Sequence, residues 1–326
     1  MAHKYSKKRT GTTFTLLLVL LIASMVAACL LGSVYIPVKE LLKSDIFWQI
    51  RLPRIILSAL IGLLLSVSGV ILQGILRNPL ADPYILGISA GSAVGAAVAI
   101  ALGLQFYWLG MSSVPLCALV FALLAVFIVY KLSKVAGRST TETLILAGVA
   151  LSAFCAAILS LIIIISGNLQ SIYFWLLGSL SAANWLNVLT VTPYALVGSL
   201  IAYFLSKELN ALLLGEEMAH TLGVEVEKTR VILITTASFM TAAAVSVAGL
   251  IGFVGLIIPH WIRLLIGPNH KWLVPISALS GMLLMVVADT ISRTALSPSE
   301  IPVGIVMALL GAPFFLYLLR TKKGEK

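Results

Sequence analysis

The chain has 326 residues, of which 60% are apolar and only 10% are charged. Soluble domains carry about a quarter charged residues, so this composition and a mean hydropathy of +1.09 exclude a water-soluble fold. Its 196 or so apolar residues, at roughly 20 for each bilayer crossing, allow about ten spans and leave only short loops. We therefore expect an all-α membrane protein with one transmembrane domain over residues 1–326.

Ten apolar blocks follow one another along the chain. They predict spans near 14–35, 55–76, 84–104, 111–132, 142–166, 186–206, 229–249, 252–267, 272–292 and 302–320. Three glycines and a proline within 249–260 indicate that the eighth span is broken or short. The segment 167–185 mixes aromatic and polar residues, which predicts an interfacial helix between the fifth and sixth spans.

The basic residues lie between the apolar blocks, so they indicate membrane topology and not a nucleic-acid surface. If the N-terminus is cytoplasmic, 17 of the 22 lysines and arginines lie inside and five lie outside. Because basic residues are retained in the cytoplasm, this split predicts both termini inside, with cytoplasmic tails at 1–13 and 321–326.

The N-terminus allows a second interpretation. A basic start, an apolar run and VAAC at 26–29 resemble a lipoprotein signal peptide that ends at Cys29. The apolar run exceeds a usual signal segment and continues past Cys29, which favours an uncleaved first span. A mature chain beginning at Cys29, detected by intact mass, would reverse this prediction.

The chain offers little chemistry of its own. Cys29, Cys117 and Cys155 lie in apolar stretches without metal-binding spacing, and the four histidines are scattered, so we predict no metal site. No phosphate-binding GxxxxGK[ST] motif occurs, so any ATP and Mg²⁺ belong to a partner and no cofactor is expected on this chain. Asp289 is the one acidic residue clearly within a span, and Arg293 at i+4 favours an ion pair over a proton relay.

The longest inner loop, residues 207–230, contains a short amphipathic segment. Glu216 to His220 lead to Leu222, and Gly223 is a natural stop for such a helix. The loop is predicted to present apolar side chains to the cytoplasm, which is costly unless a partner covers them. These side chains are Leu212, Leu213, Leu214, Met218 and Leu222.

Several long strings resemble the iron-chelate, haem and cobalamin permease family of ABC importers. They are RLPR (51–54), NPLADPYILGISAGSAVGA (78–96), EMAHTLG (217–223), GFVGLIIPHWIRLL (252–265) and ADTISRTALSPSEIPVGIVMALLGAPFFLYLLR (288–320). The resemblance implies a ten-span permease subunit, which agrees with the count of apolar blocks. It further implies a homodimer or a heterodimer with a paralogue, two cytoplasmic ATPase subunits and an extracytoplasmic binding protein, in a bacterial inner membrane.

The resemblance assigns roles to short groups of residues. Glu216, Glu217, Met218, Ala219, Leu222 and Gly223 are expected to couple the permease to its ATPase. Arg51, Arg54 and Arg293 are expected at the outer mouth, where they would dock acidic residues of the binding protein or anchor to lipid phosphate. Ser139, Thr140 and Thr141 are expected at the cytoplasmic gate or, more simply, as helix caps together with Glu142.

Small residues recur every four positions in the third span. Gly87, Gly91, Gly95, Ala99 and Gly103 predict a smooth face for close helix packing within the subunit or, alternatively, for a pathway-lining or subunit-contact role, with Asp82 as a cap before it. Pro259, His260 and Arg263 predict a kink and an interfacial anchor in the eighth span.

The resemblance favours a ferric siderophore as cargo and leaves cobalamin and haem open, because no residue separates them. The rival from another class is a stand-alone secondary transporter or channel, which would need intramembrane ionisable groups that this chain largely lacks. A non-transporting membrane scaffold is a third possibility, for which the glycine-rich broken segments would have no purpose.

Overall fold

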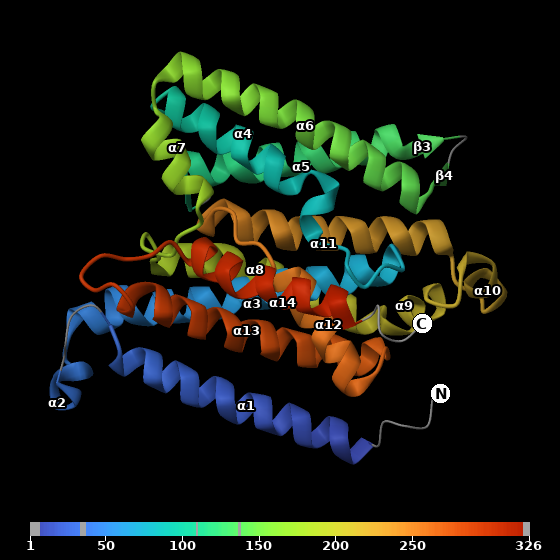
Figure 1. Ribbon diagram of the computed structural model, residues 1–326, viewed down its shortest axis with the longest axis horizontal. Coiled ribbons are helices and arrows are strands. Elements are labelled where there is room, and N and C mark those ends of the chain that lie inside the picture. The colour runs from blue at the N-terminus through green and yellow to red at the C-terminus, as the bar shows by residue number, and fades with distance from the viewer. Residues whose placement is uncertain (1–6, 33–36, 109, 136–137, 322–326) are drawn as a thin grey trace.

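The computed structural model describes residues 7–32, 37–108, 110–135 and 138–321, which form a helical bundle (Figure 1). Its helices are α1 (Lys7–Leu30), α2 (Val38–Leu41), the π-helix η1 (Phe47–Arg51), α3 (Leu52–Ile75), the 3₁₀-helix η2 (Pro83–Leu86), α4 (Ile88–Ala101), α5 (Ser113–Ser133), α6 (Thr141–Ser166), α7 (Leu169–Leu176), α8 (Trp185–Phe204), α9 (Ser206–Leu212), α10 (Glu216–Thr221), α11 (Val226–Ala248), α12 (Val254–Ile266), α13 (His270–Thr294) and α14 (Val303–Thr321). Two antiparallel two-residue pairs complete it, β1 (Tyr107–Trp108) with β2 (Met111–Ser112) and β3 (Lys134–Val135) with β4 (Arg138–Ser139).

Seven helices of the described chain are long and apolar enough to cross a membrane, and three shorter apolar helices cover Ile88–Ala101, Val254–Ile266 and Val303–Leu316. Together they match the ten predicted blocks in order. The third block differs from its prediction because residues 83–86 form η2 and the α-helix begins only at Ile88. The eighth is short, as predicted, with 13 residues in α12.

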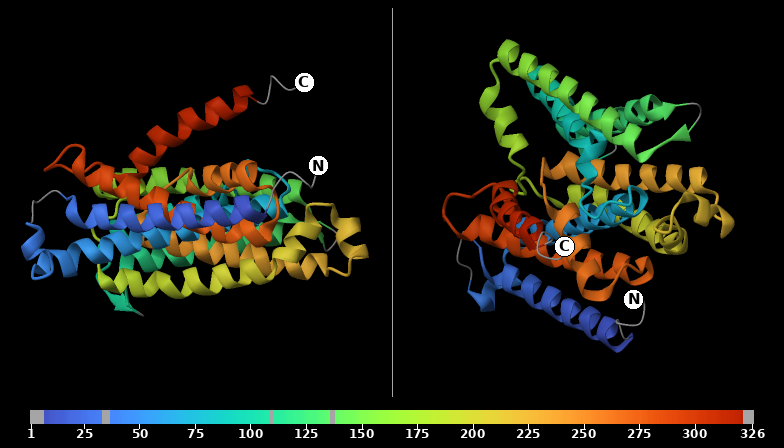
Figure 2. Two further views of the ribbon diagram at one scale, coloured as in Figure 1. Left: turned by 90° about the horizontal axis from the view of Figure 1, so that it is seen from below. Right: turned by 45° about the vertical axis from the view of Figure 1, so that its right-hand side comes forward.

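The helices run roughly along one direction, so the connections gather at two ends (Figure 1). One end holds the start of α1, the β3–β4 pair, α9 and α10, which are the segments predicted to be cytoplasmic. The opposite end holds α2, α7 and the connection from α13 to α14. Helix α14 diverges from the rest of the bundle (Figure 2).

Helix α3 lies at the centre of the bundle. In the most apolar 18-residue stretch of η1 and α3, 83% of the residues are buried inside the bundle. The corresponding share is 11% for α1 and 11% for α6. Close contact with α13 is possible because Gly62 and Gly281 face each other, where an added Cβ on either would overlap the other's backbone. Helix α1 packs on the outside through a small cluster in which Leu21 and Ala28 meet Val286 of α13.

A side chain just before the short helix α4 satisfies the backbone just before the short helix α12. At about 1.5 Å per residue neither crosses a 30 Å hydrocarbon core, so irregular backbone lies within the bundle and needs internal partners. The Tyr84 hydroxyl donates to the Ile251 carbonyl (3.0 Å) and accepts from the Ile251 amide (3.1 Å). This pairing joins the segment before α4 to the segment before α12.

Gln73 of α3 compensates for the proline in α12. Pro259 has no N–H, so the Gly255 carbonyl four residues earlier lacks its usual helical donor. The Gln73 amide donates to the carbonyls of Gly255 (3.2 Å) and Leu256 (3.1 Å), and its oxygen accepts from Arg263 Nη1 (2.8 Å). Arg263 was expected at the interface; instead it contacts this buried glutamine.

The predicted smooth face on the third span is shorter than expected. Gly91 and Gly95 lie directly against α5, where an added Cβ would overlap the carbonyls of Phe121 and Cys117. Gly87 precedes the helix with φ +76° and faces α6, and Gly103 follows the helix end. Asp82 caps η2 by accepting from the Tyr84 amide at 2.8 Å, not α4 itself.

The predicted interfacial segment 167–185 is only partly helical. Helix α7 covers eight residues, Leu169–Leu176, with Tyr173 and Phe174 exposed, and the chain then continues to α8 without regular helix. The aromatic exposure fits the predicted place at a membrane interface.

Candidate functional site

The first candidate site is the inner loop 207–230. The structure contains the predicted short helix as α10, and Gly223 follows its end with φ +83°. The Gly223 amide donates to the His220 carbonyl (2.9 Å), which closes the last turn. Glycine adopts this left-handed backbone without strain, so the sequence explains why the helix stops there.

Helix α10 buries one side and exposes the other. Ala219 is fully buried, whereas Leu214, Met218 and Leu222 are each at least half exposed. Leu212 was expected to face the cytoplasm, but it is buried because it ends α9 and packs into the core. The exposed apolar surface is therefore narrower than predicted and centred on α10.

A buried arginine holds α10 to the bundle. Arg230 of α11 pairs through Nη2 with Glu216, the first residue of α10. Its Nη1 lies 3.3 Å from Glu227, and Glu227 also accepts from the Tyr130 hydroxyl of α5 at 3.0 Å. Glu216 is thus tied to the bundle, although both it and its neighbour Glu217 are exposed. The sequence did not reveal this chain of contacts, because it depends on how α10 folds back on α11 and on the packing of the distant Tyr130 against Glu227.

A cleft of about 980 Å³ separates α10 from the start of α6. Glu216, Glu217 and Arg230 line one side, and Thr140 lines the other. Thr140 and Thr143 form a reciprocal cap, with the Thr143 amide donating to Thr140 Oγ1 (3.2 Å) and the Thr140 amide donating to Thr143 Oγ1 (3.1 Å). Thr143 thus fills the role expected of Glu142. Thr141 begins α6, and the side chain of Ser139 lies outside the described residues.

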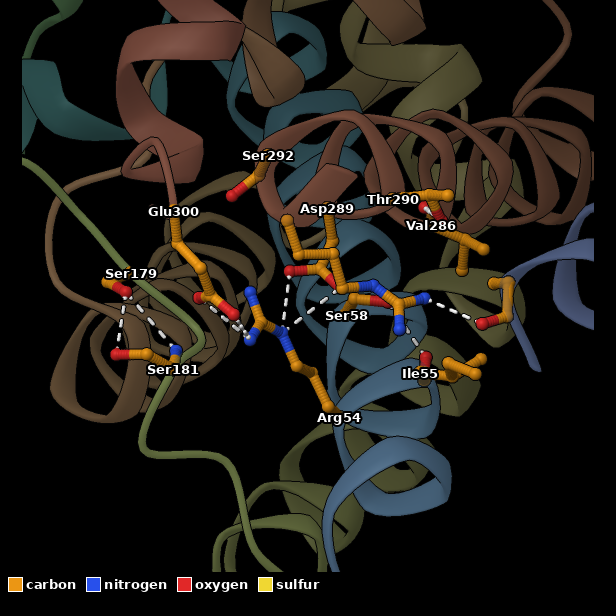
Figure 3. Close-up of polar contacts among 12 residues, drawn as sticks. Arg54, Ile55, Ser58, Ser179, Ser181, Val286, Asp289, Thr290, Ser292 and Glu300 are labelled. Carbon is orange, nitrogen blue, oxygen red and sulfur yellow. Dashed lines mark hydrogen bonds and ion pairs between the residues drawn. The ribbon is translucent and has the colours of Figure 1, made fainter. Parts of the chain in front are cut away.

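The second candidate site is the arginine cluster near the opposite end (Figure 3). Arg54 Nε lies 3.0 Å from Asp289, and Arg54 Nη1 lies 2.9 Å from Glu300. Arg293 Nε lies 3.4 Å from Asp289, which confirms the predicted i+4 ion pair. Arg293 also donates to the Ala28 carbonyl of α1 at 2.8 Å. Asp289 pairs with both arginines and Glu300 pairs with Arg54, so the cluster joins α1, α3, α13 and the segment before α14.

The expected exposure of the three arginines is wrong. Arg51, Arg54 and Arg293 are 4%, 6% and 3% exposed, and Arg51 donates to the Cys29 carbonyl at 2.9 Å. A buried guanidinium group needs a carboxylate or carbonyl partner. The sequence did not predict that Glu300 is such a partner of Arg54. A docking role through these side chains would first require their internal contacts to break.

A cavity of about 700 Å³ lies beside this cluster. Glu300 borders it, and hydroxyl and amide side chains supply its other polar groups. These are Tyr107, Ser112, Ser171, Ser179, Ser181, Asn184, Asn187 and Ser246. The Ser179 hydroxyl donates to the Ser181 hydroxyl at 3.0 Å, and Figure 3 marks this contact with a dashed line. The cavity presents hydrogen-bonding groups at the end of the bundle opposite α10, and the sequence did not predict it.

A multi-pass helical bundle with an exposed short helix at one end and a polar cavity at the other fits a membrane transport permease. Residues 16–321 match the FecCD transport family, and the chain belongs to this family. It is thus a permease of the ABC importer class, the membrane component and not a catalytic subunit. The resemblance inferred from the sequence is confirmed.

Known relatives agree with this assignment. The cobalamin import permease BtuC of Halobacterium salinarum is 47% identical over 84% of this chain and 73% of its own length. The iron(3+)-hydroxamate import permease FhuG of Bacillus subtilis is 40% identical over 84% of this chain and 83% of its own length. A solved structure described as an inward-facing metal-chelate type ABC transporter is 36% identical with a TM-score of 0.86, covering 95% of this chain and 99% of that one.

Proposed function

We propose that this permease belongs to a binding-protein-dependent importer in the cell membrane, and that α10 docks a separate ATPase subunit. The observation that carries the proposal is the exposure of Leu214, Met218 and Leu222 around a helix clamped at its start by Arg230. Exposed apolar side chains at the end of a membrane protein that faces water favour a protein partner. ATP and Mg²⁺ would bind that partner.

The assembly would contain two permease chains, identical or paralogous, two ATPases and an extracytoplasmic binding protein. Helix α6 supports the pairing of two permease chains. Its apolar residues Leu146, Ile164 and Ile165 are each at least two-thirds exposed, so a second chain has an apolar surface on which to pack. ATP-driven movement of α10 would change the cleft between α10 and the start of α6, as alternating access by rigid elements requires. Thr140 and Thr141 would lie at the gate on the far side of that cleft.

The proposed cargo is a large metal chelate, with a ferric siderophore as the first candidate. The relative named for iron(3+)-hydroxamate import and the structural neighbour named for metal chelates support it. Cobalamin is the second candidate, supported by the 47% identity to a cobalamin permease, and haem remains a third. The cavity of about 700 Å³ beside Glu300 supplies hydroxyl and amide groups that suit a polar chelate.

Uptake by the reconstituted complex tests the cargo. Proteoliposomes containing the permease, its ATPase and its binding protein would be given radiolabelled ferric hydroxamate, cobalamin or haem. We expect ATP-dependent accumulation of the ferric hydroxamate. Accumulation of cobalamin alone would replace the first candidate with the second, and ATP-independent flux would favour a secondary transporter or channel.

Reversal of one exposed charge tests the docking surface. Glu217→Arg should leave the permease folded, because Glu217 is exposed, and should abolish substrate-stimulated ATP hydrolysis by reversing charge at the docking face. Glu225→Arg is a matched control, since Glu225 is also exposed in this loop but pairs with Lys228 at 3.6 Å. Normal transport by Glu217→Arg would contradict this role for α10.

A further inference from the structure

A narrow apolar groove runs between the inner halves of α5 and α11. It has a volume of about 240 Å³ and is lined by Leu123, Val126, Phe127, Tyr130, Val231, Ile234, Thr235, Ser238 and Phe239. Its polar side chains add little polarity: the Ser238 hydroxyl bonds to the Ile234 carbonyl of its own helix at 2.7 Å, and Tyr130 directs its hydroxyl to Glu227. Phe127 and Phe239 are 55% and 40% exposed, so the groove is open on the outside of the described chain.

Two lysines lie at the end of this groove that is nearer the loops predicted to be cytoplasmic. Lys131 Nζ lies 4.9 Å from the ring centre of Phe127, and Lys134 Nζ lies 4.8 Å from that of Tyr130. Both rings line the groove, so cation–π contact holds two ammonium groups against its walls. Glu227 lies near the same end, and its carboxylate is engaged by Arg230 and by the Tyr130 hydroxyl.

We propose that the α5–α11 groove is a binding site for an anionic phospholipid of the inner leaflet. The apolar groove takes part of one acyl chain, and Lys131 and Lys134 contact the phosphate. Charge complementarity selects this occupant: an apolar slot that ends at two fixed ammonium groups matches a lipid with an apolar tail and an anionic head. The stretch of α5 from Leu123 to Tyr130 spans roughly 10 Å, which suits part of a chain within one leaflet.

Native mass spectrometry of the full-length permease tests this site. The delipidated protein would be titrated with dioleoyl phosphatidylglycerol or dioleoyl phosphatidylcholine. We expect one retained phosphatidylglycerol per chain in preference to phosphatidylcholine. Lys131→Gln with Lys134→Gln should weaken phosphatidylglycerol binding about 25-fold, at about fivefold for each lysine, and leave phosphatidylcholine binding unchanged.

Three further variants separate the parts of the site. Thr235→Leu, which fills the groove, should weaken both lipids, and Phe127→Leu, which removes one ring, should weaken phosphatidylglycerol alone. Lys207→Gln with Lys228→Gln is the matched control, because these lysines are exposed at the same end but, unlike Lys131 and Lys134, make no cation–π contact with the groove rings among the described residues. This control should bind both lipids as the wild type does.

The proposal is overturned if the wild type shows no headgroup preference, or if the control pair loses it as fully as the groove pair. It is also overturned if Phe127→Cys forms a disulfide-linked dimer in the membrane, because a second chain would then cover the groove. None of these results depends on transport, so the cargo and ATPase proposals stand or fall separately.

Discussion

At the scale of single residues, the arginine cluster shows how burial changes the meaning of a charge. Arg54 and Asp289 are 235 positions apart, yet they form a buried pair, and Glu300 adds a second carboxylate to the same guanidinium. Three arginines at one end of the spans, which oppose the positive-inside bias, are thereby explained by internal pairing.

Arg54→Met should destabilise the protein by about 3–5 kcal/mol, because it leaves two carboxylates without their shared partner. The measurement is the thermal unfolding midpoint of the purified permease in detergent, with Lys43→Met, an exposed lysine of the same outer region, as control. An unchanged midpoint combined with slower association of the binding protein would restore the docking role.

Gln73 makes a second prediction at this scale. Gln73→Leu removes the donor that replaces the one missing at Pro259 and the acceptor of Arg263, so we expect a loss of about 1–3 kcal/mol for unsatisfied buried groups. Thermal unfolding of Gln73→Leu would be compared with that of Gln105→Leu, which changes an exposed glutamine. Equal midpoints for the two variants would mean that other groups satisfy the Gly255 carbonyl.

At the scale of elements, the end of α10 depends on one backbone conformation. Gly223 has φ +83°, and an added Cβ would meet nothing within 4 Å, so a substitution there is limited by conformation and not by space. The left-handed region is open to glycine and, at lower cost, to asparagine, but proline fixes φ near −65°.

Gly223→Pro should therefore distort α10 and abolish substrate-stimulated ATP hydrolysis, while Gly223→Asn should retain most of it. Both variants would be reconstituted with the ATPase and compared by hydrolysis rate with and without loaded binding protein. If proline and asparagine gave equal, normal stimulation, the shape of this loop would not matter for coupling.

At the scale of the whole molecule, the two ends of the bundle are chemically distinct. One end carries α10 and the β3–β4 pair (Figure 1), and the other carries the polar cavity and the arginine cluster. The excess of lysine and arginine predicts which end faces the cytoplasm.

Single cysteines at exposed positions of each end test this orientation. In a chain with its three native cysteines changed to serine, Glu217→Cys should react with an impermeant thiol reagent only in inside-out vesicles. Leu102→Cys, which is exposed beyond the end of α4, should react only from the outside. The reverse pattern would mean that the positive-inside count assigns the topology incorrectly.

The sequence by itself determined the class of fold, the ten apolar segments, the short eighth helix, α10 with its glycine stop, and the Asp289–Arg293 pair. Each of these rests on local composition, helical spacing or a local backbone preference, which a single sequence displays directly. The family could also be recognised, because its motifs are long and occur in order.

Only the tertiary structure decided the partners of Arg54, Gln73, Tyr84 and Arg230. The contacts of Arg54, Gln73 and Tyr84 join segments that are far apart in the chain, and those of Arg230 join consecutive helices whose relative placement depends on packing of the whole bundle. For the same reason the sequence predicted exposed arginines where the structure buries them: hydropathy places a residue near a membrane surface, but only its neighbours determine whether its charge meets water or a carboxylate.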